Sequence, residues 1–166
     1  MIIGFHHPGI VVPDLERACA FYSEALGFEY IREFGWDRSE SEQGVAVMGI
    51  PDTAARCAIL KGPNCYLELF KYESPEQRGN PNERRACDPG IAHIAFQVTD
   101  IDAVFEKFKA AGGIVHNSPA KTGEGRSIYC RDPFGNIIEL MEVGDDEPDF
   151  DLIVDDLLPE SASPAD

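Results

Sequence analysis

Two histidines and two glutamates stand at matching places in the two halves of this chain. They are His7, Glu68, His93 and Glu139, and each glutamate lies within an otherwise apolar run of residues. A carboxylate among apolar side chains is costly to bury unless it has a partner. Two imidazoles and two carboxylates form a mixed set of nitrogen and oxygen ligands, which suits Zn, Ni, Co, Mn or Fe rather than Mg or Ca alone. The four residues therefore predict one divalent metal ion with coordination positions left open for a substrate oxygen.

An internal repeat relates the two halves. At a constant offset, His7 corresponds to His93, Asp14 to Asp100, and Gly27 to Gly113; the further matches are Val12 with Val98, Leu15 with Ile101, and Tyr22 with Phe108. In each half a segment of alternating apolar residues precedes an aspartate that can cap a helix, because its carboxylate accepts from the free N–H groups of the first turn. The glycines stand where these helices end.

Each half is predicted to fold as β-α-β-β-β, which makes the chain an α+β protein. Helices are expected at 16–26 and 102–111, with an additional short helix within 39–50. The strands expected after each helix are 28–34, 56–61 and 65–72 in the first half and 114–117, 127–131 and 136–143 in the second. The predicted domain spans 1–144, with modules at about 5–72 and 91–143. An acidic C-terminal tail occupies 145–166; within it 159–166 is expected to be disordered and the more apolar stretch 150–158 to have a packing role at most.

Composition excludes several classes of function. Acidic residues number 30 against 14 basic ones, so the net charge of −16 opposes binding to nucleic acid or to an anionic membrane. No apolar run approaches the ~20 residues that span a bilayer, and the N-terminus does not resemble a secretory signal. The five cysteines include no Cys-x-x-Cys pair, which indicates reduced thiols and a cytoplasmic protein.

Each ligand candidate also has an ordinary structural interpretation. A single histidine in a strand is more often a core or edge residue, and a single glutamate in a strand usually faces solvent. The coincidence of four such residues across a repeat favours the metal site. His6 is expected to be structural, because alternation places it on the face opposite His7, and His116 is expected at the surface.

Several stretches resemble the vicinal oxygen chelate superfamily. They are 7–22, then Ala25-Leu-Gly-Phe28, then Asp132-Pro-Phe-Gly-Asn-Ile-Ile-Glu-Leu140. The superfamily includes glyoxalase I, methylmalonyl-CoA epimerase, extradiol dioxygenases, fosfomycin-resistance enzymes and bleomycin-binding proteins. The resemblance covers roughly residues 5–143 and implies paired modules whose mixed sheet curls around a metal cavity, with ligands at His7, Glu68, His93 and Glu139.

The resemblance also implies a reaction. A metal-dependent isomerase, epimerase or lyase of the glyoxalase or methylmalonyl-CoA epimerase type would bind a small carbonyl substrate and stabilise an enolate or enediolate on the metal. Glu139 or Glu68 would be the catalytic base, with Arg126 and Tyr129 as substrate-lining residues. The chain has no basic residue shortly after His7 and has Tyr72 where glyoxalase I commonly has Asn, so glutathione is not indicated as part of the substrate.

Other members of the superfamily supply the alternatives. An Fe(II) extradiol-type dioxygenase uses two histidines and one carboxylate, which leaves Glu68 surplus. A non-catalytic small-molecule-binding resistance protein generally lacks the metal ligands, and a fosfomycin-type transferase would have His in place of Glu68. A homodimer is expected by analogy. Relatives build the site either within one chain or across two, and the sequence leaves both arrangements open.

Overall fold

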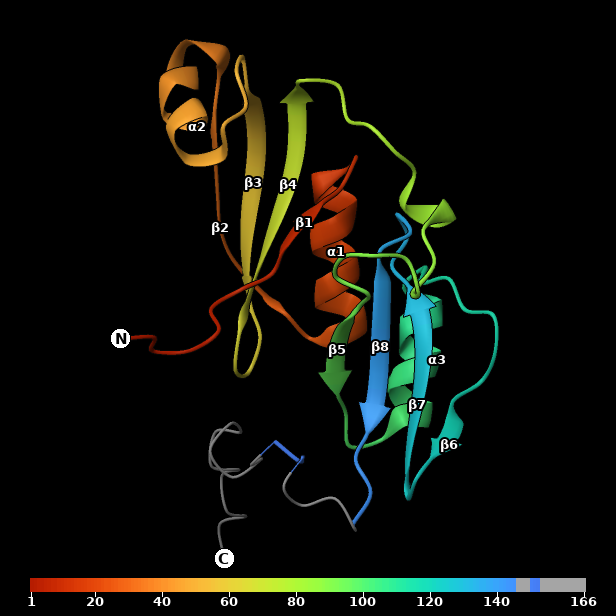
Figure 1. The fold of residues 1–166 in the computed structure, drawn as a ribbon. Coiled ribbons are helices and arrows are strands. Elements are labelled where there is room, and N and C mark those ends of the chain that lie inside the picture. The colour runs from red at the N-terminus through yellow and green to blue at the C-terminus, as the bar shows by residue number, and fades with distance from the viewer. Residues whose placement is uncertain (146–149, 153–166) are drawn as a thin grey trace, which may run out of the picture.

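The first half of the chain forms one β-α-β-β-β module with an inserted helix (Figure 1). The computed structural model describes residues 1–145 and 150–152, apart from the side chains of residues 40, 41 and 43. The elements of this first module are β1 (Gly9–Val11), α1 (Leu15–Leu26), β2 (Glu29–Trp36), the 3-10 turn η1 (Arg38–Glu40), α2 (Ser41–Met48), β3 (Ala54–Lys61) and β4 (Tyr66–Ser74). The expected short helix within 39–50 is thus confirmed as α2.

The second half repeats this plan after a linker that contains the 3-10 turn η2 (Pro81–Glu83). Its elements are β5 (Ile94–Gln97), α3 (Ile101–Ala110), β6 (Ala120–Thr122), β7 (Gly125–Arg131) and β8 (Ile137–Glu142). The predicted helix caps are confirmed, because Asp14 accepts from the Arg17 N–H and Asp100 accepts from the Ala103 N–H, both at 3.0 Å. Gly27 ends α1 at φ 73°, a left-handed conformation that glycine adopts without strain.

Two four-stranded mixed sheets follow from this plan, which confirms the predicted α+β class. The strand orders are β1-β4-β3-β2 and β5-β8-β7-β6, so β1 and β5 each form the edge of a sheet. β1 runs parallel to β4 and β5 runs parallel to β8, while the other neighbours are antiparallel. The first strand of each module therefore lies beside the last, and this places each histidine near its glutamate.

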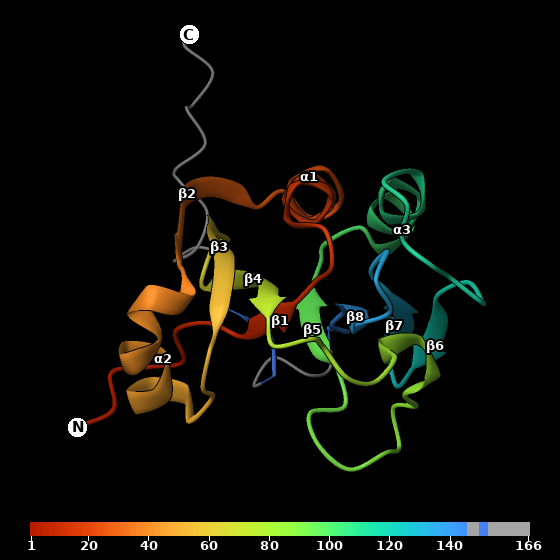
Figure 2. The same ribbon diagram turned by 90° about the horizontal axis from the view of Figure 1, so that it is seen from above.

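Helices α1 and α3 cover the same side of the two sheets (Figure 2). Phe21 of α1 meets Phe108 of α3 edge to face at 5.0 Å between ring centroids, so a single hydrophobic core runs beneath both modules. Apolar residues of β4 and β8 fill that core; the fully buried ones are Leu67, Leu69, Ile138 and Leu140. The other face of each sheet carries no helix in the residues described, apart from α2 at one end of the first sheet.

One predicted strand is wrong. Residues 114–117 form only a single antiparallel bridge, between Ile114 and Arg131, and β7 pairs instead with β6. The chain turns away after Ile114 because a short polar stretch ending at Pro119 cannot continue a ladder of hydrogen bonds. A stretch of four residues was too short to distinguish a strand from an isolated bridge.

The predicted acidic tail lies mostly outside the described residues. Of the tail, the structure describes residue 145 and residues 150–152, and within the latter the Leu152 N–H donates to the Gln97 side chain of β5 at 2.9 Å. None of the helices in the described part of the chain is long and apolar enough to cross a membrane.

A buried hydrogen-bond network joins the two modules at Asp132. This aspartate accepts from the Tyr22 hydroxyl of α1 at 2.9 Å and from the backbone N–H groups of Phe134 and Asn136, both at 2.9 Å. Tyr22 and Asp132 are both fully buried. Burial, followed by the charge of Asp132, raises the pKa of Tyr22 well above its usual value, so its hydroxyl remains a donor.

We expect Tyr22→Phe to lower the free energy of unfolding by about 1–3 kcal/mol, because a buried carboxylate loses one donor. Tyr30→Phe is the matched control: Tyr30 is exposed, and its loss of a hydroxyl should change stability by less than about 0.5 kcal/mol. Urea unfolding of the two variants measures the difference. Equal midpoints for both variants would contradict a stabilising role of the Tyr22–Asp132 bond.

Candidate metal centre

Each module places one histidine against one glutamate. His7 Nε2 lies 3.0 Å from Glu68 Oε2, and His93 Nε2 lies 2.9 Å from Glu139 Oε2. The parallel pairing of first and last strands brings them together, because Gly9 lies opposite Glu68 and Ala95 lies opposite Glu139. The four side chains are 15–35% exposed, so both pairs are partly desolvated but open to a ligand.

Strand alternation puts both glutamates on the face away from the helices. Leu67 and Leu69 point into the core, so Glu68 between them points to the open face of the first sheet. Ile138 and Leu140 do the same for Glu139 in the second sheet. Both His–Glu pairs therefore lie on open sheet faces.

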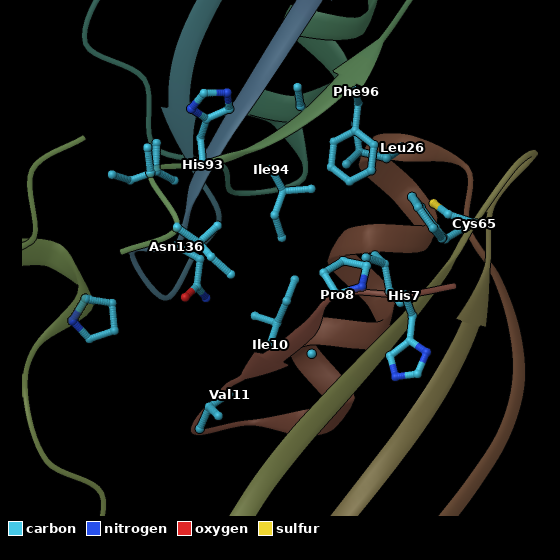
Figure 3. A pocket seen from close by; sticks show the side chains of 18 of the residues that line it. His7, Pro8, Ile10, Val11, Leu26, Cys65, His93, Ile94, Phe96 and Asn136 are labelled. Carbon is cyan, nitrogen blue, oxygen red and sulfur yellow. The ribbon is translucent and has the colours of Figure 1, made fainter. Parts of the chain in front are cut away.

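Within one chain the two pairs do not converge. Figure 3 shows the imidazole rings of His7 and His93 directed away from each other, with Ile10 and Ile94 between them. Both histidines border a cleft of about 1710 Å³ between the edges of the two sheets, whereas neither Glu68 nor Glu139 lines it. In the part of the chain that the structure describes, no three His, Cys, Asp or Glu side chains are grouped closely enough to hold a metal ion.

His6 supports His7, a role that the sequence did not reveal. His6 Nδ1 lies 2.6 Å from His7 Nδ1, and the His6 ring stacks on Tyr66 at 5.0 Å between centroids. The expectation that His6 lies on the opposite face and takes no part is corrected, because both residues precede β1 and strict strand alternation does not apply there. This contact at Nδ1 holds the His7 ring with its Nε2 directed toward Glu68.

His93 differs from His7 in the hydrogen bonding of its Nδ1 atom. Its Nδ1 is buried and has no hydrogen-bond partner in the structure. The ring of Tyr129 lies 4.5 Å from the His93 ring, tilted by 44°, and Tyr129 is directly opposite Glu139 in the sheet. Burial, followed by the charge of Glu139, raises the pKa of Tyr129, so the phenol is a neutral donor beside the pair.

The donor set of each pair suits a divalent cation. An imidazole nitrogen and a carboxylate oxygen lie side by side in each module, and both are first-row metal ligands. Each His–Glu pair supplies two ligands, so a site with four protein ligands needs two such pairs. The residues present therefore fit a metal ion, as two half-sites rather than one complete site.

Arg126 is already engaged in an ion pair. Its guanidinium donates to both carboxylate oxygens of Asp102 in α3, at 2.6 and 2.8 Å. It borders a smaller hollow of about 490 Å³ that contains His93 and Glu139, with Ser127 and Met141 also in the lining. Its role in lining a substrate site stays a prediction, whereas its contact with α3 is structural.

Two buried thiols are unsuited to nucleophilic chemistry. Burial raises the pKa of Cys57 and of Cys130 to about 12, so both are protonated at neutral pH. Burial also raises the pKa values of Cys19 and Cys65, and Cys87 is exposed. These environments indicate that Cys87 alone is poised for modification.

Comparison with known proteins identifies the family. The sequence profile of the Glyoxalase/Bleomycin resistance protein/Dioxygenase superfamily matches residues 4–140, so the chain belongs to that superfamily. This confirms the resemblance seen in the sequence.

Relatives of known name include an epimerase and a lyase. The chain is 33% identical over 149 residues to a 2-epi-5-epi-valiolone epimerase of Actinomyces sp, covering 85% of this chain and 80% of that protein. It is 30% identical over 138 residues to a probable lactoylglutathione lyase of Vibrio cholerae, covering 82% and 88%. A glyoxalase family protein of Bacillus cereus has a similar fold, with a TM-score of 0.74 at 22% identity over 86% of this chain and 95% of that one.

We expect one fast-reacting thiol in the native protein when it is treated with an aromatic disulfide reagent near pH 8. Cys87→Ser should abolish the fast phase, whereas Cys57→Ser should leave it intact because the Cys57 thiol is buried and protonated. Absorbance of the released thiolate measures the reaction, and unfolding should expose all five cysteines. A fast phase that survives in Cys87→Ser and disappears in Cys57→Ser would overturn this assignment.

Proposed function

We propose that the protein is a divalent-metal-dependent isomerase, epimerase or lyase that removes a proton next to the carbonyl group of a small substrate. The observation that carries the proposal is the pair of His–Glu half-sites at equivalent positions on the open faces of the two sheets. The superfamily membership and the epimerase and lyase relatives support it.

The complete site requires a second copy of the chain. The two half-sites point away from each other within one chain, so His7 and Glu68 of one copy would join His93 and Glu139 of another. A two-fold symmetric dimer brings these surfaces together twice and so creates two equivalent sites. Exposed apolar side chains that line the cleft favour such contact; they are Phe5 and Ile91.

A bound divalent cation would act as a Lewis acid that polarises the carbonyl of the substrate. His7, Glu68, His93 and Glu139 would hold it. The proton transfers are assigned to the chain's own carboxylates, Glu68 and Glu139. Either one can take the proton from the substrate, and the other, on the opposite wall of the composite site, can return a proton from the other side. That arrangement suits an epimerisation, which needs proton transfer on both faces of one carbon.

Tyr129 completes the proposed site as a neutral hydrogen-bond donor. Its ring contacts His93, and its raised pKa keeps the hydroxyl protonated at neutral pH. A phenol next to a carboxylate base can donate to oxygen on the substrate as negative charge develops there. His6 would act one step further away, by holding the His7 ring through Nδ1.

We expect the wild-type protein to catalyse deuterium uptake from D₂O at the carbon next to a carbonyl. Glu139→Gln and Glu68→Gln should each slow the exchange at least about 100-fold, because each carboxylate is both a ligand and a candidate base. Proton NMR of methylmalonyl-CoA and of 2-epi-5-epi-valiolone follows the exchange. Glu73→Gln, an exposed position on β4, is the matched control and should exchange at the wild-type rate.

Elemental analysis of the same proteins separates the alternatives. Zn, Ni, Co or Mn that is lost in both Glu68→Gln and Glu139→Gln supports the proposal. Iron that stays in Glu68→Gln and is lost in Glu139→Gln would favour a dioxygenase instead. A wild-type protein that holds no metal after reconstitution would contradict the proposal and favour a binding protein.

A further inference from the structure

The open face of the first sheet extends well beyond the His7–Glu68 pair. Glu68 of β4 lies opposite Ile59 of β3, which in turn lies opposite Arg32 of β2. Side chains directly opposite each other share a face of the sheet. Arg32 therefore lies on the same face as Glu68, two strands away, and a register shift between Tyr30 and Arg32 sets this alignment.

Arg32 keeps its positive charge available on this face. Its guanidinium lies 5.2 Å above the centre of the Phe34 ring and its side chain is exposed. No described carboxylate lies within ion-pair distance of it, although acidic residues outnumber basic ones by 30 to 14. Arg56 on β3 shows the contrast, because it is paired with Glu16 and Glu33.

Aromatic side chains continue the same face beyond Arg32. Phe34 lies opposite Cys57, which lies opposite Phe70, and Phe70 stacks on Tyr72 at 5.8 Å with an interplanar angle of 15°. These rings are half-buried in a single chain. The Tyr72 hydroxyl also contacts the sulfur of Met48 in α2 at 3.3 Å, so α2 closes this end of the surface. The result is an apolar wall beside the cationic Arg32 side chain, with Lys61 of β3 on the same face at the other end, opposite Tyr66.

We propose that Arg32 is a specificity-determining residue, which binds a carboxylate or phosphate group of the carbonyl substrate while Phe34 packs against the adjoining carbons. This proposal rests on the proposed function, because it assigns the far end of the substrate held at His7 and Glu68. Two strand spacings separate the Arg32 and Glu68 backbones by about 10 Å. A substrate with several carbon atoms between its carbonyl and its anionic group spans that distance.

Arginine suits this role for two reasons. Its planar guanidinium can bind both oxygens of a carboxylate or phosphate, and stacking on Phe34 holds it in place while leaving its N–H groups available. The protein carries a net charge of −16, which repels anions as a whole. An anionic substrate therefore needs a local cationic contact on the face where it binds.

The test is a titration followed by ¹⁵N NMR of the full-length protein, with three ligands of similar shape. They are 5-oxohexanoate, its neutral methyl ester, and 4-oxopentyl phosphate. We expect at least one of the two anions to bind at least about tenfold more tightly than the ester and to shift the β2 amides near Arg32. The tighter of the two anions identifies carboxylate or phosphate as the preferred group.

Matched variants decide whether Arg32 is responsible. Arg32→Met should weaken anion binding at least about tenfold and leave ester binding unchanged, and Arg32→Lys should be intermediate. Lys71→Met removes the same charge from the opposite face of β4 and should bind like the wild type. Equal affinities for anion and ester, or an Arg32→Met variant that binds anions like the wild type, would overturn the proposal.

The deuterium-exchange assay separates this proposal from the proposed function. Arg32-dependent anion binding without any proton exchange would leave the anion subsite standing and contradict the isomerase. Proton exchange with no preference for anionic ligands would support the isomerase and overturn the role of Arg32.

Discussion

The packing of α1 and α3 against the same side of both sheets determines where the reactive side chains lie. The helices bury Leu67, Leu69 and their counterparts in β8, and alternation then forces Glu68 and Glu139 to the opposite faces. Phe21 of α1 and Phe108 of α3 are in contact, so the helices of the two modules pack together. The two His–Glu pairs lie on the open faces and are not grouped closely enough to hold one metal ion in the described part of the chain.

This placement of the reactive side chains limits the kind of site that one chain can form. A single chain offers two His–Glu pairs, each with one imidazole and one carboxylate, and in the proposed dimer a second copy would complete them. The two walls of the composite site would then be chemically different. One wall carries the His6–His7 contact, Arg32 and a row of aromatic rings, and the other carries Tyr129 beside His93. An asymmetric cavity of this kind can orient a substrate as well as polarise it.

Much of the fold was accessible from the sequence because it depends on local patterns. The repeat predicted both helices, both aspartate caps and most strands, and it placed Glu68 and Glu139 in the last strand of each half. The strand predicted at 114–117 was wrong because a pattern of four residues cannot distinguish a strand from a single bridge. The sequence predicted the four residues as one ligand set, whereas the pairing of each histidine with the glutamate of its own module is visible only in the structure.

The packing of the two modules against each other could not be predicted from the sequence, because it depends on contacts between residues far apart in the sequence. Phe21 and Phe108 are separated by about half of the chain, and nothing near either residue encodes their contact. The same holds for Arg126, whose partner Asp102 lies on another element, and for Arg32, whose place on the same sheet face as Glu68 depends on an irregular register in β2. The contact of His6 with His7 could not be predicted because regular alternation does not extend to the segment before β1.

The most direct test of the composite site mixes two inactive proteins. One carries His7→Ala with Glu68→Ala, the other carries His93→Ala with Glu139→Ala, and the two are unfolded together and refolded. If each site combines half-sites from two copies, mixed dimers regain one intact site, and metal content and proton exchange should return to about a quarter of the wild-type level. If mixing restores neither metal binding nor exchange while the wild type refolded in the same way regains both, the composite site is contradicted.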